Sequence, residues 1–232
     1  MLRRIAERLS RGVVLRRRLP RPFQGLPIYV TPEAGLRYWG AMDNVDPLLY
    51  GMAQELVKPG SVVWDVGANV GLFSFCAAVL AGREGVVLAI EPDLWLAQLI
   101  WRSARSLRAN DAPCAEVKML CVSVSDTNRV SELEIAQSPT VTLDSLLDFF
   151  PPPSVLKIDV ETHEGSVLAG ATRLLKEYRP TIWCEVSQEN SKQLTQLFLN
   201  AGYELYGDES QPHPRCDYAW FNTLAIPARK AA

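Results

Sequence analysis

The sequence lacks the features of several classes of protein. Its five cysteines are odd in number and include no CxxC pair, so they suit neither a zinc site nor a disulfide framework. No apolar run reaches the roughly 18 residues that a membrane-spanning helix needs. The apolar stretch at 12–15 is followed at once by three arginines, unlike a secretory signal. We therefore expect a cytoplasmic globular protein with reduced cysteines.

Positive charge is concentrated at the N-terminus. Eight of the 24 Lys and Arg residues lie within the first 21 positions, beside a single acid. The remainder is mildly acidic, which argues against a nucleic-acid partner held by a basic face. Apolar residues recur at helical spacing over 2–15, so we expect either a short amphipathic helix with weak membrane-surface contact or a solvated arm.

From residue 62 onward, strand and helix patterns alternate. This alternation predicts an α/β fold with a mostly parallel sheet covered on both faces. We assign residues 1–45 to a basic arm and lead-in, and residues 46–232 to the main domain. The expected strands are 28–30, 62–66, 86–90, 117–124, 130–136, 154–160, 181–186, 203–207 and 218–226. The expected helices are 46–57, 71–81, 93–107, 142–149, 165–178 and 190–201.

The stretch VVWDVGANVGLFSF carries the first functional signal. A buried strand ends near Asp65 and is followed by Gly67, Asn69 and Gly71 before a helix begins. Glycines permit positive φ and a close approach to the main chain, and we expect Asn69 to adopt a left-handed conformation or to bond through its side chain. A strand, a glycine turn and a helix N-terminus form a common site for nucleotide-like ligands.

Acidic residues recur where the expected strands end. Ligands of such sheets bind at the carboxyl ends of the strands, so a row of acids there favours a cationic or hydroxyl-rich ligand over a phosphate-rich one. S-adenosylmethionine combines a sulfonium, an amine, a carboxylate, a ribose diol and an adenine. The acids are Asp65, Glu91, Asp126, Asp159 and Glu185.

Each acid near the first three strands has an expected role toward this cofactor. Asp65 faces its amino-acid part, and Glu91, followed by Pro92, accepts hydrogen bonds from the ribose hydroxyls. Asp126, with Ser125 beside it, accepts from the adenine amino group. A dinucleotide site would need GxGxxG, and the turn at 67–71 lacks the middle spacing.

These motifs together resemble one family, the FkbM-type class I S-adenosylmethionine-dependent methyltransferases. The resemblance covers roughly residues 55–205 and rests on VVWDVGANVG, AIEPD, VSD, TLDSLL, LKIDVETHEGSVLAGA and RPTIWCEV. It implies a three-layer Rossmann-like fold with seven strands, the last antiparallel, and O-methylation. Thr162 stands where the family usually has glycine, and a β-branched residue there would change the backbone or narrow the acceptor pocket.

Methyl transfer to a hydroxyl requires alignment and a group that accepts the proton. The candidates are Asp159, Glu161 and His163. Histidine titrates near neutrality and suits a general base, although His163 could also be a solvated or helix-capping residue. Asp159 could take the proton, orient the acceptor or contact the methionine amine, while Glu161 could instead form a structural ion pair. We expect no metal site.

The sequence therefore predicts transfer of a methyl group from S-adenosylmethionine to a hydroxyl oxygen of a small-molecule or glycan acceptor. The alternatives are a non-catalytic binding module on the same fold and, less favoured, a nucleotide-cofactor oxidoreductase. Neither the acceptor nor the oligomeric state can be read from the residues.

Overall fold

The computed structural model describes residues 10–129, 138–207 and 212–228. The expected strand at 130–136 lies outside this range. The chain divides into two compact units, of which unit 1 comprises Met1–Ser61 and Ala68–Cys121, and unit 2 comprises Val62–Gly67 and Val122–Ala232. Among the helices of the described residues, none combines the length and the apolar character that crossing a bilayer requires.

Unit 1 contains a pair of parallel strands with helices packed on them. Strands β4 and β5 pair in parallel, with Ile90 opposite Leu120, and α3 and α4 pack against them. Asp93 starts α4 because its carboxylate accepts hydrogen bonds from the N–H groups of Trp95 and Leu96 at 2.8 and 3.1 Å. The elements are β1 (Leu15–Arg18), β2 (Pro27–Val30), α2 (Pro47–Leu56), α3 (Leu72–Ala81), β4 (Val86–Ile90), α4 (Leu94–Ala109) and β5 (Glu116–Leu120), with short 3₁₀ turns over 21–44.

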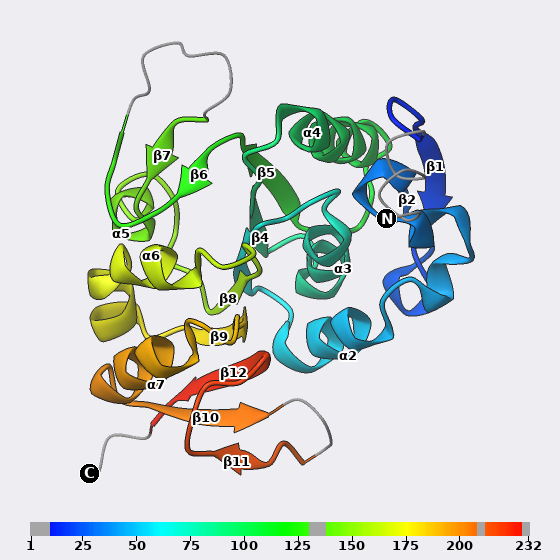
Figure 1. The fold of residues 1–232 in the computed structure, drawn as a ribbon. Coiled ribbons are helices and arrows are strands. Elements are labelled where there is room, and N and C mark those ends of the chain that lie inside the picture. Colours follow the sequence, from blue (N-terminus) through cyan, green and yellow to red (C-terminus); the bar gives the residue numbers. More distant parts are fainter. Residues whose placement is uncertain (1–9, 130–137, 208–211, 229–232) are drawn as a thin grey trace. The chain divides into compact units, whose positions relative to one another are not determined.

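Unit 2 holds the remaining strands. Strand β3 pairs in parallel with β8, which pairs in parallel with β9, and β12 runs antiparallel between β9 and β10 (Figure 1). The elements are β3 (Val62–Val66), β6 (Ser123–Val124), β7 (Thr140–Val141), α5 (Leu143–Leu146), β8 (Val155–Ile158), α6 (Glu164–Ala169), a π-helical segment (Leu174–Tyr178), β9 (Thr181–Glu185), α7 (Ser191–Asn200), β10 (Tyr203–Gly207), β11 (Arg215–Cys216) and β12 (Asn222–Pro227).

Within unit 2 the strand order is β11-β10-β12-β9-β8-β3, and within unit 1 β4 pairs with β5. The expected Rossmann-like class is confirmed, since the pairings β3–β8, β8–β9 and β4–β5 are all parallel and the last strand of the chain, β12, is antiparallel to its neighbours. The two-residue strand β11 adds an eighth strand to the expected seven. Strand β3 is almost wholly buried, as its apolar run predicts, with Trp64 and Asp65 both at 0% exposure.

Two expected elements are each divided into two. Strand β5 stops at Leu120 rather than continuing to 124, because Ser123 and Val124 pair with β7 in a separate two-stranded sheet. The helix expected at 165–178 is interrupted after Ala169. The Asp144 carboxylate accepts from the N–H groups of Arg173 and Leu174, so a second helical segment begins there.

Of the two alternatives considered for residues 2–15, the amphipathic helix is wrong for the described part. Residues 10–12 form a turn, and β1 begins at Leu15 and pairs antiparallel with β2. Residues 2–9 lie outside the described range. The arginines of β1 bind backbone carbonyls of the lead-in, since Arg17 donates to Tyr38 and Trp39 at 3.2 Å each and Arg18 donates to Gly25 at 3.1 Å.

Candidate functional site

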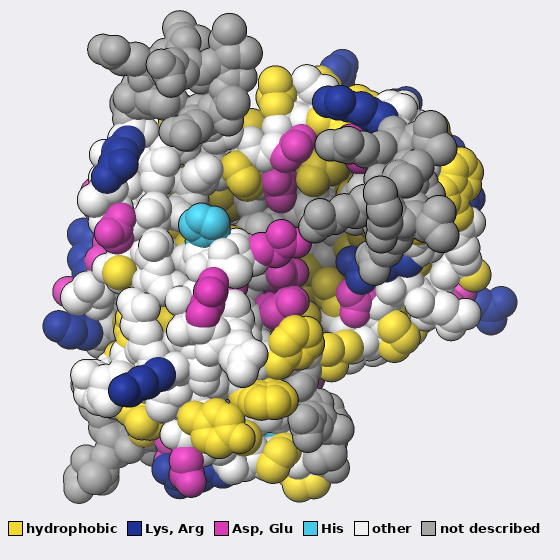
Figure 2. All heavy atoms as spheres, viewed as in Figure 1, with side chains coloured by type: hydrophobic (Ala, Val, Ile, Leu, Met, Phe, Trp, Pro, Cys, Tyr) yellow, Lys and Arg dark blue, Asp and Glu magenta, His cyan; other side chains and the backbone are white. Residues whose placement is uncertain are grey.

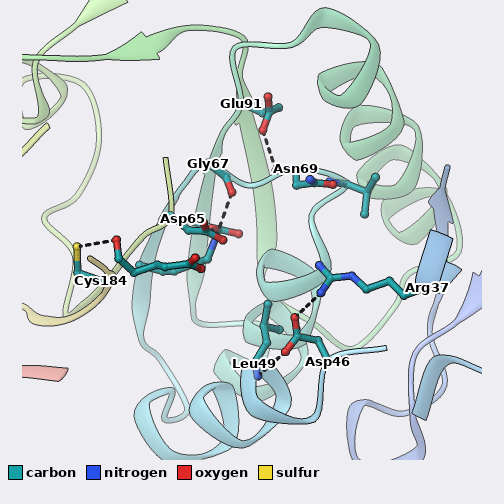
Figure 3. A network of polar contacts seen from close by, with 12 residues as sticks. Arg37, Asp46, Leu49, Asp65, Gly67, Asn69, Glu91 and Cys184 are labelled. Atoms are coloured by element: carbon teal, nitrogen blue, oxygen red, sulfur yellow. Dashed lines mark hydrogen bonds and ion pairs between the residues drawn. The ribbon is translucent and has the colours of Figure 1, made fainter. Parts of the chain in front are cut away.

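In unit 1, the candidate residues meet where β4 ends. Glu91 is only 7% exposed, and each of its carboxylate oxygens accepts a backbone hydrogen bond. The N–H of Asn69 donates to one oxygen at 2.7 Å, and the N–H of Asp93 donates to the other at 2.9 Å. Figure 3 marks the bond between the Glu91 carboxylate and Asn69. These two bonds fix the orientation of a buried carboxylate at the carboxyl end of the strand.

The turn that leads into α3 has the expected backbone geometry. Asn69 is left-handed, with φ 55°, and its side-chain oxygen accepts from the N–H of Val70 at 2.7 Å, which confirms both features expected of it. Gly71 has φ 82° at the N-cap of α3. A Cβ at Gly71 would lie 2.8 Å from a ring carbon of Phe75, so the glycine also lets the helix pack.

Cys121 is a neighbour of this carboxylate that sequence reasoning missed. The N–H of Glu91 donates to the carbonyl of Leu120 at 3.0 Å, and the Cys121 thiol lies 3.6 Å from the carbonyl oxygen of Pro92. Burial, together with the charges of Glu91 and Asp93, raises the pKa of the Cys121 thiol. The parallel register of β4 and β5 is the signal that could have placed it here.

In unit 2, a buried lysine gathers two of the expected acids. Lys157 is 4% exposed, and its amine lies 3.1 Å from Asp65 and 3.3 Å from Asp159. The same amine donates to the carbonyl of Gly67 at 3.1 Å (Figure 3). Burial alone lowers the pKa of Lys157, but the two carboxylates outweigh it and raise that pKa. Lys157 is therefore a positive charge shared by two acids.

Sequence reasoning did not assign Lys157 this role. The signal is the pairing of β3 with β8, in which Asp65 and Lys157 stand directly opposite. Adjacent positions on parallel strands point to the same face, so the lysine must meet the acid. Glu161, for which a structural ion pair was the alternative role, is exposed.

The packing of the chain's own backbone, rather than a ligand, requires glycine at position 67. Its φ is 77°, and a Cβ there would lie 1.8 Å from the carbonyl oxygen of Asp159. The close approach that the glycine permits is thus made by the backbone that follows β8.

Asp159 and Glu185 form a coupled pair of carboxyl groups. Their side chains share a hydrogen bond, and Glu185 is half-buried at the end of β9. Burial, then the charge and hydrogen bond of Asp159, raise the pKa of Glu185 to about 7, while Lys157 acts in the opposite direction. The pair therefore contains one carboxyl group that changes its protonation near neutrality.

The loop after β8 is held by a buried acid. The Glu164 carboxylate, 2% exposed, accepts from the N–H of Thr162 at 2.8 Å, from Ser187 at 3.0 Å and from Asn190 at 2.6 Å. Thr162 has φ 72°, in the region that favours glycine. The departure from the family glycine therefore coincides with a strained position.

Glu161 and His163 lie on this loop, and both are exposed. The Nδ1 atom of His163 is 3.0 Å from the carbonyl oxygen of Glu161. Glu161 is itself left-handed, with φ 41°. These two expected catalytic residues contact each other through the backbone, while Asp159 belongs to the lysine-centred cluster.

Ser125 and Asp126 follow β6 rather than a strand of the large sheet. The Ser125 hydroxyl donates to Asp126 at 3.2 Å, and the Ser125 N–H donates to the carbonyl of Val141 at 2.9 Å. Asp126 is exposed. A Cβ at Gly170 would lie 2.3 Å from the Ser125 carbonyl, so the segment packs against the end of α6.

A cavity of about 490 Å³ in unit 1 contains none of the expected site residues. It lies along the C-terminal half of α4 and the start of β5. The described residues include no group of three or more His, Cys, Asp and Glu side chains arranged to hold a metal ion.

Several solved structures share this architecture. The methyltransferase FkbM from Methylobacillus flagellatus KT aligns with a TM-score of 0.55 at 17% identity, over 76% of this chain and 50% of that chain. Precorrin-6y C5,15-methyltransferase from Geobacter metallireducens GS-15 aligns with a TM-score of 0.51 at 15% identity, over 79% and 88%. Fibrillarin from Aeropyrum pernix, solved with bound S-adenosyl-L-methionine, aligns with a TM-score of 0.50 at 12% identity, over 78% and 74%. At these identities the likeness establishes the fold, that of the Rossmann-like methyltransferases.

The family follows from the sequence. Residues 65–205, more than half of the chain, match the methyltransferase FkbM domain. The chain belongs to this family, and the expected cofactor S-adenosylmethionine is confirmed.

One curated relative is the hexuronic acid methyltransferase AglP of Haloferax volcanii. It is 27% identical over 159 residues, which cover 63% of this chain and 65% of that protein. The match thus spans less than two thirds of the relative's length.

Proposed function

We propose that the protein transfers a methyl group from S-adenosylmethionine to a hydroxyl oxygen of a glycan or small-molecule acceptor. The observation that carries the proposal is the cluster formed by Lys157, Asp65, Asp159 and Glu185. It combines acids held by a buried counter-charge with one carboxyl group whose pKa is about 7. A group of this kind can take a proton from a hydroxyl at neutral pH.

Glu91 provides the test of whether the cofactor fits. Its carboxylate is buried, and the two backbone donors fix the orientation of both oxygens at the carboxyl end of β4. Two adjacent, immobilised acceptor atoms suit the two neighbouring hydroxyls of a ribose. When bound, S-adenosylmethionine supplies a methyl carbon activated by the attached sulfonium.

The proposed cofactor-binding residues are those expected from the sequence. In unit 1, Glu91 would accept from the ribose, with Asn69, Gly71 and Pro92 shaping the backbone around it. In unit 2, Asp65 would act by holding Lys157 and the Gly67 carbonyl in place. The remaining pair, Ser125 and Asp126, would receive the adenine amino group.

For the proton, we propose the pair of Asp159 and Glu185 as the acceptor. Burial and the neighbouring charge of Asp159 raise the pKa of Glu185 to about 7, so Glu185 is the member of the pair that gains and loses a proton near neutral pH. Glu161 and His163 are proposed to act at the exposed side of the same loop, where both side chains are accessible to an acceptor.

The acceptor class rests on a distant relative. AglP is named for methylation of a hexuronic acid, and its match to this chain is 27% identical. We therefore propose a sugar hydroxyl as the preferred acceptor. A non-catalytic member of the family is the alternative, and the strained Thr162 is the observation that favours it.

The proposed activity is tested in two stages. Titration calorimetry should detect binding of S-adenosylmethionine and not of NAD. A screen of sugars and secondary metabolites with radiolabelled methyl donor should then yield a methylated product. Asp159→Asn should reduce turnover of that acceptor at least a hundredfold while cofactor binding persists. Binding of the cofactor with no methylated product across the screen would support the non-catalytic alternative.

A further inference from the structure

Three aromatic side chains stand exposed in the loop before β12. Tyr218, Trp220 and Phe221 have exposed fractions of 56%, 55% and 56%. We call residues 218–221 the aromatic loop. Figure 2 shows hydrophobic side chains gathered over the part of the chain that Figure 1 labels β12 and β10. Large aromatic residues grouped at a surface usually mark a binding site.

The backbone of the aromatic loop is firmly held. Ala219 is fully buried, its N–H donates to the Thr195 hydroxyl at 2.7 Å, and its carbonyl accepts from Ser191. The N–H of Trp220 donates to the Thr223 hydroxyl at 2.8 Å. The rings are therefore presented to solvent by an ordered scaffold, and binding would cost little additional ordering of the loop.

The aromatic loop adjoins the pair of acids. The carbonyl of Phe221 accepts a hydrogen bond from the N–H of Val186, the residue after Glu185. The next residue, Asn222, stands opposite Glu185 in the pairing of β12 with β9. The rings thus emerge beside the carboxyl end of the strand that supplies the proposed proton acceptor.

Building on the proposed function, we infer that Tyr218, Trp220 and Phe221 bind the ring of a sugar acceptor. The C–H face of a pyranose packs on aromatic faces, while its hydroxyls remain free to donate to neighbouring acids. Tyr218 and Trp220 meet edge to face, with centroids 6.4 Å apart and planes at 75°, so each is braced by the other. Their polar N–H and O–H groups suit a ligand that is apolar on one face and polar at its edge.

The test measures sugar binding by ligand-observed NMR, with S-adenosylmethionine present. The probes are methyl β-glucuronide and methyl β-glucoside, one acidic and one neutral. Trp220→Ala and Tyr218→Ala should each weaken binding about tenfold, the size expected for one aromatic contact, and Trp220→Phe should retain most of the affinity. Trp39→Ala and Trp101→Ala are matched controls, because each of these tryptophans is 52% exposed in unit 1.

The outcomes separate this inference from the proposed function. Calorimetry should show unchanged binding of S-adenosylmethionine to Trp220→Ala, which also reports that the variant is folded. Equal sugar affinity in wild type and Trp220→Ala would overturn the inference, and so would the absence of binding by both probes. Sedimentation showing a dimer that Trp220→Ala dissociates would assign the surface to a second copy of the chain instead. Failure of the wild-type protein to bind S-adenosylmethionine would count against the proposed function.

Discussion

Replacing Lys157 by methionine tests the centre of the acid cluster. The substitution retains much of the apolar volume and removes the charge that lies 3.1 Å from Asp65 and 3.3 Å from Asp159. Asp65 is fully buried, so its carboxylate would lose its nearby counter-charge where water cannot replace it. At 3.1 Å and an effective dielectric constant of about 20, one such attraction is about 5 kcal/mol before desolvation is considered.

Most of that attraction offsets the cost of burying the charges in the wild type. The measurable effect is the penalty for leaving one charge behind, which is about 3–5 kcal/mol when one partner of a buried pair is removed. We therefore expect Lys157→Met to lower the free energy of unfolding by about 3–5 kcal/mol at pH 7.5. Urea denaturation monitored by circular dichroism measures this free energy.

A second substitution separates charge from packing. Adding Asp65→Asn to Lys157→Met removes the stranded charge, so the double variant should recover at least about 2 kcal/mol relative to the single one, as a coupling energy between contacting residues. A loss below about 1 kcal/mol, or no recovery in the double variant, would refute this account.

Arg37→Met is the matched control for a surface charge. Arg37 lies 2.9 Å from Asp46 in unit 1, but its side chain is 45% exposed (Figure 3). Because exposed ion pairs contribute about 0–1 kcal/mol, this variant should lose less than about 1 kcal/mol. A similar loss in both variants would show that proximity, rather than burial, sets the effect.

Three further predictions follow from single residues. The pKa of Glu185 is raised to about 7, so the folded state keeps a proton that the unfolded chain loses above about pH 4.5. The free energy of unfolding should therefore fall as the pH rises from 5 to 8. Glu185→Gln should reduce that fall by about 1–2 kcal/mol, a value that allows for the partial exposure of the side chain. Thr162→Gly, relieving φ 72°, should be about 1 kcal/mol more stable than Thr162→Ala, and equal stabilities by urea denaturation would remove the strain argument. Gly67→Ala should cost more than about 4 kcal/mol or prevent folding, because its Cβ would lie 1.8 Å from the Asp159 carbonyl. Gly60→Ala should cost only about 1 kcal/mol, because its φ is also positive, at 79°, but a Cβ there meets no described atom within 4 Å.

The spacing of apolar residues, together with the glycine and charged residues that end each apolar run, predicted most of the fold. The strands at 62–66 and 86–90 agree with the structure residue for residue, because an apolar run between glycine or charged boundaries leaves little freedom in where a central strand ends. The errors occur where a distant segment decides the outcome. Strand β6 leaves the large sheet to pair with β7, and Asp144 interrupts a helix that is continuous in the residue pattern. Neither partner can be identified from local sequence.

The candidate site also has features that the local sequence predicts and features that depend on distant segments. Acids at strand ends could be found along the sequence, since parallel strands expose their carboxyl ends at one edge. The roles of Lys157 and Glu185 depend on register, because the lysine becomes a shared counter-charge only when β8 sets it opposite Asp65. A one-residue shift of β8 would turn the lysine to the other face and leave the acids without it. The chemistry of this cluster is therefore a property of strand alignment, and in this chain the alignment is supported by Gly67, where only the absence of a side chain lets the Asp159 backbone come close enough.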